Sequence, residues 1–142
     1  MNIVEVTGGK AKERELVEAT VKWCIKKMMP RMRTLNIEVT LRNIDSAYGY
    51  CMEGDTNREF ELDVRKGLSL FDLVSTVCHE MVHVKQYARG ELGHRSDGSQ
   101  KWKAKPNLPR ETHYMATPWE KEAFEKEAGL AIACFMSVTF SL

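Results

Sequence analysis

The chain has 142 residues, of which 43% are hydrophobic and 29% are charged, and its formal net charge is +1. This composition excludes a disordered chain, and the length predicts that residues 1–142 form a single domain. The near-zero charge gives no general reason to expect nucleic acid, an anionic membrane or a strongly acidic substrate as a partner.

The N-terminal segment has neither the basic start nor the long apolar run of a secretory signal, so we expect a cytoplasmic protein. The apolar run from Ala128 to Leu142 is shorter than the ~20 residues that span a bilayer. The four cysteines are far apart in sequence and form no Cys-x-x-Cys pair. They are therefore expected to be reduced thiols rather than zinc ligands or disulfides.

Strands and one helix are predicted in the front half of the chain. Ile3 to Val6 has a short alternating pattern that ends at Gly8-Gly9, and 10–29 has helical spacing that ends at Pro30. Residues 35–44 alternate between apolar and polar, which indicates a strand with one buried face. Residues 48–52 and 58–64 are two further strand candidates, joined by a turn-rich loop that suits a hairpin. These segments predict a small, mostly antiparallel sheet.

Two helices are predicted in the second half. Ser69-Leu70-Phe71-Asp72 has the spacing of a capping box, the apolar pattern runs on to Ala88, and Gly90 is placed to end the helix. The polar stretch 91–117 is expected to be irregular or a second hairpin around Trp102 and Tyr114. A last helix begins near Pro118 and includes the apolar tail. The resulting class is α+β.

The helix over 69–88 carries the sequence His79-Glu80-Met81-Val82-His83. Residues four apart lie on one face of a helix, so His79 and His83 can converge on one metal ion. Glu80 projects about 100° from His79, beside such an ion, where it can take a proton from an activated water. With 4 His and 15 Glu in the chain, this pattern arises by chance at about the 1% level. The pattern therefore predicts a zinc site with Glu80 as general base.

The side of the helix that carries the histidines is polar along most of its length. Asp72, Thr76 and Gln86 lie on the same broad side as the histidines. Thr76 and Gln86 are candidates to orient the imidazole N–H groups, although exposed polar residues also occur on such faces. The stripe is expected to face a cleft.

A catalytic zinc site normally has three protein ligands and an open position, so one ligand remains to be found. On the last helix Glu120 and Glu127 fall within the apolar arc, whereas Glu122 falls on the expected solvated side. A carboxylate on a buried face needs a partner, and this favours Glu120 as the third ligand.

Several alternatives to Glu120 stay open. Thr117-x-x-Glu120 is also the spacing of a capping box, which needs no metal. Glu127 could ligate the ion, act as an acid that contacts a ligand residue, or pair with a charge, and His94 and His113 are further candidates for the third ligand. The metzincin arrangement is excluded, because it requires glycine and histidine where this chain has Gln86 and Arg89.

The segments 79–86 and 114–123 resemble the zincin metallopeptidases of the gluzincin type, in particular small single-domain zincins. The resemblance implies a zincin-like fold, a peptide-bond hydrolase and a Glu-x-x-Ala stretch whose glutamate, here Glu120, is the third ligand. The Asp or Asn that usually follows the alanine is Phe124 here. The resemblance also implies an edge strand beside the cleft, which we place at 58–64.

A second resemblance is to the SprT-like zincins, which share the His-Glu-Met start and take a third histidine from a Gly-His segment. Gly93-His94 matches that segment in part, although the glycine that usually follows is Arg95. This resemblance implies an association with nucleic acid, for which the basic stretch 95–105 around Trp102 is a candidate.

The main expectation is a zinc-dependent metallopeptidase with a protein or peptide substrate. Zinc would be held by His79, His83 and Glu120, with Glu80 as the base and Tyr114 as a hydrogen-bond donor to the developing oxyanion. The alternatives are the SprT-like zincin and an adaptor module whose zinc is not catalytic. Glu80 argues against the adaptor, because a structural zinc site does not need that carboxylate.

Overall fold

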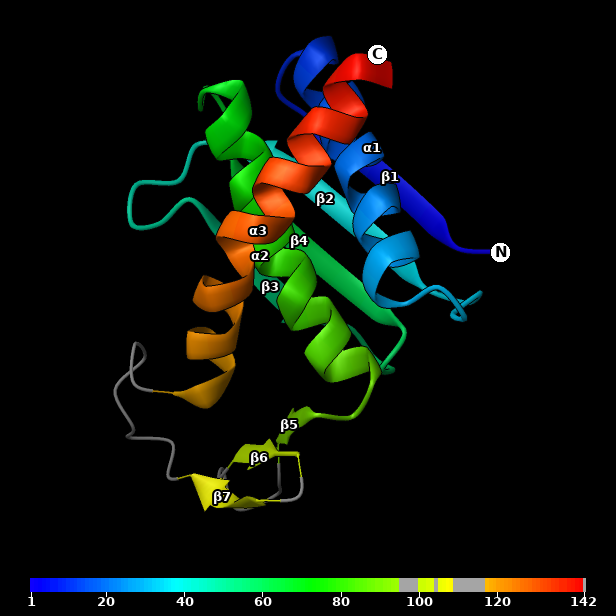
Figure 1. The fold of residues 1–142 in the computed structure, drawn as a ribbon, viewed down its shortest axis with the longest axis vertical. Coiled ribbons are helices and arrows are strands. Elements are labelled where there is room, and N and C mark those ends of the chain that lie inside the picture. Colours follow the sequence, from blue (N-terminus) through cyan, green and yellow to red (C-terminus); the bar gives the residue numbers. More distant parts are fainter. Residues whose placement is uncertain (95–99, 104, 109–116, 142) are drawn as a thin grey trace.

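The computed structural model describes residues 1–94, 100–103, 105–108 and 117–141, with side chains at 1–93, 101–103 and 117–138. The described part of the chain has an α+β fold with three helices and two sheets (Figure 1). In chain order its elements are β1 (Ile3–Gly8), α1 (Ala11–Met28), β2 (Asn36–Arg42), β3 (Gly49–Glu53), β4 (Glu59–Arg65), α2 (Leu70–Ala88), β5 (Leu92–His94), β6 (Gln100–Trp102), β7 (Lys105–Leu108) and α3 (Pro118–Ser141).

The larger sheet has the strand order β1-β2-β4-β3. The β1–β2 and β2–β4 pairs are parallel, and only β3–β4 is antiparallel. The prediction of a mostly antiparallel sheet is therefore wrong, although the hairpin between β3 and β4 is confirmed. Because α1 connects β1 to β2 and packs on the same sheet, these neighbouring strands must run in the same direction.

The edge strand is also different from the one expected. β4 lies between β2 and β3, so the strand at the edge is β3 rather than the segment 58–64. After β2 the chain first forms β3 at the edge and then returns through the hairpin to insert β4 beside β2. Alternation of apolar residues shows that β4 has one buried face, but it does not show which strands are its neighbours.

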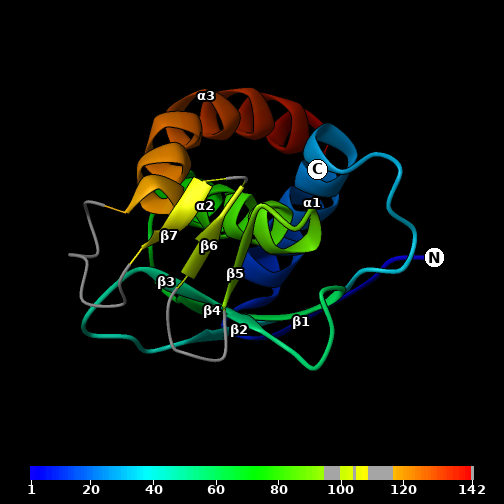
Figure 2. The same cartoon turned by 90° about the horizontal axis from the view of Figure 1, so that it is seen from below.

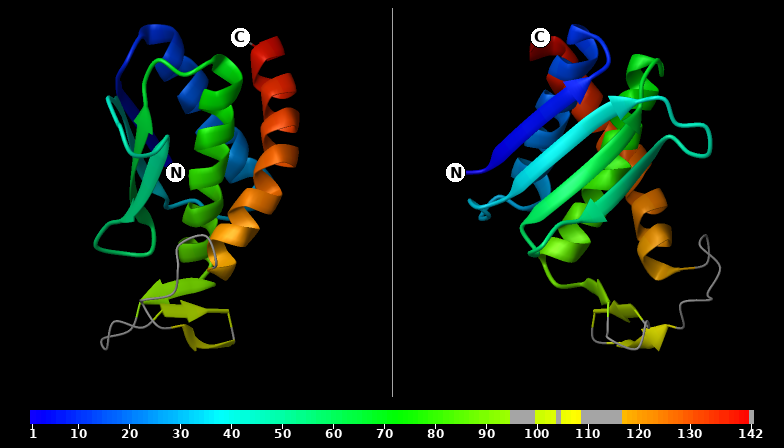
Figure 3. Two further views of the ribbon diagram at one scale, coloured as in Figure 1. Left: turned by 90° about the vertical axis from the view of Figure 1, so that its left-hand side faces the viewer. Right: turned by 180° about the vertical axis from the view of Figure 1, so that it is seen from behind.

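The elements form layers in which α2 is central. α1 and α2 cover one face of the sheet. α3 packs on the side of these two helices that faces away from the sheet (Figures 2 and 3). Alternate residues of β2 and β4 face these helices and are buried, including Ile37, Val39, Phe60 and Leu62. Because α2 has neighbours on all sides, its polar residues are buried together with its apolar ones.

The ends of α2 follow the predicted signals. Ser69 Oγ accepts a hydrogen bond from the Asp72 backbone N–H at 3.1 Å, which caps the first turn. The helix ends at Ala88, and Gly90 follows with a φ of +72°, a conformation that glycine adopts without strain. These caps fix the start and end of the helix that carries the histidines.

The small sheet β5-β6-β7 lies beyond the C-terminal end of α2. Trp102 is only 4% exposed and packs with Leu92 and Trp119, its ring centroid 6.1 Å from that of Trp119. A buried ring is not available to stack on a nucleic-acid base. The aromatic residue on which the nucleic-acid interpretation depended therefore has a structural role.

The four cysteines are free thiols, as expected. Cys24, Cys78 and Cys134 come from the three helices and are fully buried in their common core, with the Sγ atoms of Cys24 and Cys78 3.8 Å apart. Burial raises the pKa of the Cys51 thiol well above its ordinary value. None of the helices in the described residues is both long and apolar enough to cross a membrane.

Glu13 joins the start of α1 to the turn before α2. Its carboxylate accepts hydrogen bonds from the backbone N–H groups of Lys10 at 2.8 Å and Gly67 at 2.9 Å, and its side chain is buried. The hydrogen bond from Gly67, followed by that from Lys10, lowers the pKa of Glu13 below its ordinary value of 4.5. The ionised form is therefore favoured by folding.

We expect Glu13→Gln to lower the free energy of unfolding at pH 7 by about 1–2 kcal/mol, because a charged acceptor of two hydrogen bonds is lost. A lowered pKa stabilises the fold above the unfolded-state value and ceases to do so as the pH falls through the folded-state value. The difference between wild type and variant should therefore shrink below about pH 4. Urea unfolding from pH 3 to 7 measures this effect. Glu15→Gln, an exposed change in the same helix, is the control. A deficit independent of pH would contradict the assignment.

Candidate metal centre

The centre of the candidate site is a group of three side chains from two helices. His79 and His83 project from α2 and Glu120 from the first turn of α3, and each offers a ligand atom such that all three lie within 4.8 Å of one another. His79 and His83 are each 6% exposed and Glu120 is 4% exposed. The structure thus brings together the three residues that the sequence selected, and this group could hold a metal ion.

Glu120 faces both histidines with different oxygens. Its Oε1 lies 3.1 Å from His79 Nε2 and its Oε2 lies 3.0 Å from His83 Nε2. The second contact does not have hydrogen-bond geometry, so the buried His83 Nε2 has no hydrogen-bond partner. A buried nitrogen without such a partner is costly unless it binds something else, and a metal ion would satisfy its lone pair.

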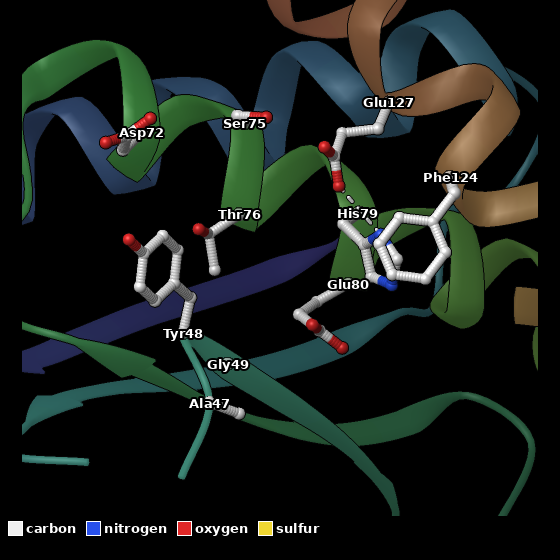
Figure 4. Close-up of a pocket in the computed structure, with 10 residues that line it drawn as sticks. All are labelled: Ala47, Tyr48, Gly49, Asp72, Ser75, Thr76, His79, Glu80, Phe124 and Glu127. Atoms are coloured by element: carbon white, nitrogen blue, oxygen red, sulfur yellow. Dashed lines mark hydrogen bonds and ion pairs between the residues drawn. The ribbon is translucent and has the colours of Figure 1, made fainter. Parts of the chain in front are cut away.

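The other imidazole nitrogens have partners that fix their orientation. His79 Nδ1 lies 2.9 Å from Glu127 Oε1, as the dashed line in Figure 4 marks, and His83 Nδ1 lies 2.8 Å from Gln86 Oε1. Carboxylate and amide oxygens are acceptors, so each Nδ1 carries the hydrogen and each Nε2 of a neutral ring is left as a lone-pair donor. This is the tautomer that metal-binding histidines commonly adopt when an oxygen orients them.

The amide nitrogen of Gln86 is also hydrogen-bonded, which fixes the orientation of this side chain. Its Nε2 donates to the Trp119 carbonyl at 3.0 Å and to Glu122 Oε1 at 3.1 Å, and the residue is fully buried. Glu122 does not lie on the solvated side as expected, because its carboxylate also pairs with Lys85 and Lys103 and is only 15% exposed. It contacts the residue that orients His83 rather than the histidines themselves.

The charges of the group favour a cation. Burial opposes protonation of His79, but its hydrogen bond with Glu120 and the charge of Glu80 outweigh that effect and raise its pKa. For His83, burial again opposes protonation, but its contact with Glu120 and the charges of Glu120 and Glu80 outweigh that effect and raise its pKa. Burial also acts to raise the pKa of Glu120, but its contacts with the two imidazoles lower it to about 2. Buried carboxylates thus surround the two imidazoles with negative charge, which favours a cation at this point and which a divalent ion would offset.

Glu80 lies next to His79 on α2 and lines a pocket beside the group of three. It is 6% exposed, and burial raises its pKa above the ordinary value. In Figure 4 its carboxylate lies between Thr76 and Phe124. This position leaves Glu80 beside the metal site and open to the pocket, rather than within the ligand group.

Part of the pocket was not expected from the sequence. Tyr48 and Gly49 line it from the start of β3, and Phe124 lines it from α3, where its ring packs on His79 with 4.6 Å between the ring centroids. A Cβ on Gly49 would lie 2.9 Å from Thr76 Cγ2 and 3.4 Å from Glu80 Cγ, so the edge strand approaches α2 closely only because this residue is glycine. An isolated glycine in a strand pattern was the one signal of this close approach.

Some candidate residues lie outside the described part of the chain. These are Tyr114, the expected oxyanion donor, His113, and the side chain of His94. Their roles stay predictions.

The comparisons with known proteins give no relatives. No family model matches the chain, and neither a curated protein nor a solved structure matches it. The chemistry of the site therefore has to follow from its own residues and geometry.

We expect Glu120→Gln to reduce the affinity for divalent transition-metal ions by at least about 100-fold, because it removes the carboxylate whose two oxygens face the two Nε2 atoms. Competition with a chromogenic chelator measures the affinity. Glu125→Gln, an exposed change one turn further along α3, should leave it unchanged. Equal affinity in the two variants would remove Glu120 from the site.

Glu127→Ala should weaken metal affinity by about 10-fold, because His79 loses the carboxylate that orients its Nδ1–H group. The same chelator competition detects this change, with Glu125→Ala as its control. Since the Glu127 side chain is 31% exposed, the fold should persist, which circular dichroism would verify. A loss as large as that of Glu120→Gln would indicate that Glu127 ligates the ion directly.

Proposed function

We propose that this protein is a zinc-dependent metallopeptidase whose metal ligands are His79, His83 and Glu120. The observation that carries the proposal is the buried His-His-Glu group with Glu80 next to it at the wall of an open pocket. A site that only stabilised the fold would not require a buried carboxylate beside the ligands and facing a cavity. The resemblance of segments 79–86 and 114–123 to gluzincins supports the same function.

Zinc is favoured by the type and number of donors. Two imidazole nitrogens and one carboxylate are the ligand set of a catalytic zinc site that keeps one position open, whereas Mg²⁺ and Ca²⁺ prefer oxygen donors alone. Bound to these three residues, zinc would supply Lewis acidity that acidifies a water molecule and polarises the scissile carbonyl.

The residues of the chain would divide the remaining tasks among them. Glu80 takes the proton from the attacking water and later returns it to the leaving amine, a role that its place between the ligands and the pocket allows. Glu127 and Gln86 keep the two imidazoles in the orientation that directs each Nε2 to the site. Phe124 covers His79 and limits the access of water to that side.

The decisive experiment combines metal analysis with turnover. Zinc-replete wild type and its Glu80→Gln variant should both contain one zinc per chain, while His79→Ala should contain none. Glu80→Gln should lower the rate of hydrolysis of a mixed peptide substrate by at least about 100-fold, the usual scale for a lost general base. Wild type without zinc, or undiminished cleavage by Glu80→Gln, would overturn the proposed mechanism.

A further inference from the structure

The pocket beside the metal site extends well past the catalytic residues. It has a volume of about 350 Å³, within the range of ligand-binding cavities, and α2 lines it from Glu80 back to Asp72 (Figure 4). His79 lies seven positions after Asp72, which corresponds to about 10 Å along the helix axis. A substrate group that fills this pocket from the metal site must therefore be long.

Aromatic side chains line the pocket on both sides of Thr76 and Glu80. Figure 4 shows Tyr48 on one side and Phe124 on the other. Both are 40–50% exposed, Tyr48 at 48% and Phe124 at 44%. The Arg65 guanidinium lies 4.8 Å from the centre of the Tyr48 ring, which shows that this ring already accepts a cation on one of its faces.

The charged residues that line the pocket are acidic. Asp72, Glu80 and Glu127 contribute carboxylates, and no lysine or arginine is found among the described lining residues. Glu127 is engaged with His79, and Glu80 lies at the metal end. Asp72 lies at the far end and is exposed, and its carboxylate has neither a hydrogen bond nor an ion pair with another described side chain. Its charge is free to attract a ligand.

Thr76 provides a second and independent indication of a ligand. The residue is 7% exposed, and its methyl group is turned to Gly49. Its hydroxyl points into the pocket on the side of Tyr48 and makes no hydrogen bond to any described residue (Figure 4). Because the rest of the residue is buried and the hydroxyl opens onto the pocket, Thr76 offers a hydrogen-bonding site to a ligand there, about one helical turn from Asp72.

We propose that this cavity, which we call the Asp72 pocket, receives a lysine or arginine side chain of the substrate next to the scissile bond. The inference rests on the proposed peptidase function and assigns its substrate class. A long aliphatic stem packs between Tyr48 and Phe124, the cationic end reaches Asp72, and the Thr76 hydroxyl accepts one of its N–H groups. An acidic side chain would be repelled by the same carboxylates, and an apolar one would leave the Thr76 hydroxyl without a partner.

The first test measures binding without catalysis. Nα-acetyl-arginine amide and the uncharged, isosteric Nα-acetyl-citrulline amide are titrated into the full chain, with and without zinc, while the Gly49 amide and Thr76 methyl signals are followed by NMR. The arginine compound should bind about fivefold more tightly, the scale of one partly exposed ion pair. Asp72→Asn should abolish the difference. Asp55→Asn, the same change in the exposed β3–β4 loop, should preserve it.

The second test determines from the cleavage products which side chains the protein prefers next to the cleaved bond. Zinc-loaded protein is given a mixture of peptides of random sequence, and the new termini are identified by mass spectrometry. One side of the cleaved bond should be enriched in lysine and arginine, Asp72→Asn should lose this enrichment, and Asp72→Lys should shift it toward aspartate and glutamate.

The two tests separate this inference from the function on which it rests. Cleavage without a basic preference, or equal binding of the two amides, overturns the Asp72 pocket and leaves the peptidase in place. If the zinc-loaded chain cleaves no peptide, the peptidase proposal fails. In that case a preference for the arginine amide that depends on Asp72 still supports a basic ligand, and equal binding still overturns it.

Discussion

The burial of α2 beyond its first turn is the constraint on which the rest of the structure depends. His79, Glu80, His83 and Gln86 lie in the middle layer of the fold, where a polar group without a partner costs about 1–3 kcal/mol. His79, His83 and Gln86 have partners on α3, namely Glu120, Glu127 and the Trp119 carbonyl. The packing of α3 on α2 is therefore defined by polar pairing as well as by apolar contact. The same pairing orients both histidines toward one point.

Local patterns predicted most of the elements but not their arrangement. Caps and apolar periods indicated α1, α2 and α3 nearly to the residue, since these signals depend only on neighbours in sequence. The direction of β1 relative to β2 depends on where α1 packs, and the insertion of β4 beside β2 depends on pairing across the sheet. Neither is encoded in the alternation of a single strand. The helix between the first two strands is the sequence signal for a parallel pair.

The residues of the candidate site also divide into those that the sequence could place and those that depend on the arrangement of the elements. The angle of each residue around its helix follows from the sequence alone. These angles put His79, His83 and Gln86 on one side of α2 and Glu120 on the buried side of α3. The role of Glu127 was left open, because its contact with His79 Nδ1 depends on how α3 packs on α2. Tyr48 and Gly49 could not be placed, because they reach the pocket through the order of strands in the sheet.

The contact between α2 and α3 at Glu120 joins positions 41 residues apart along the chain. An ion shared by His79, His83 and Glu120 would act as a removable cross-link that closes the whole intervening loop, including the small sheet. By analogy with a covalent cross-link over a loop of this length, closure would reduce the entropy of the unfolded chain by the equivalent of about 4 kcal/mol. Withdrawal of the ion would then loosen α3 first, so that the supply of metal governs the lifetime of the folded chain as well as its chemistry.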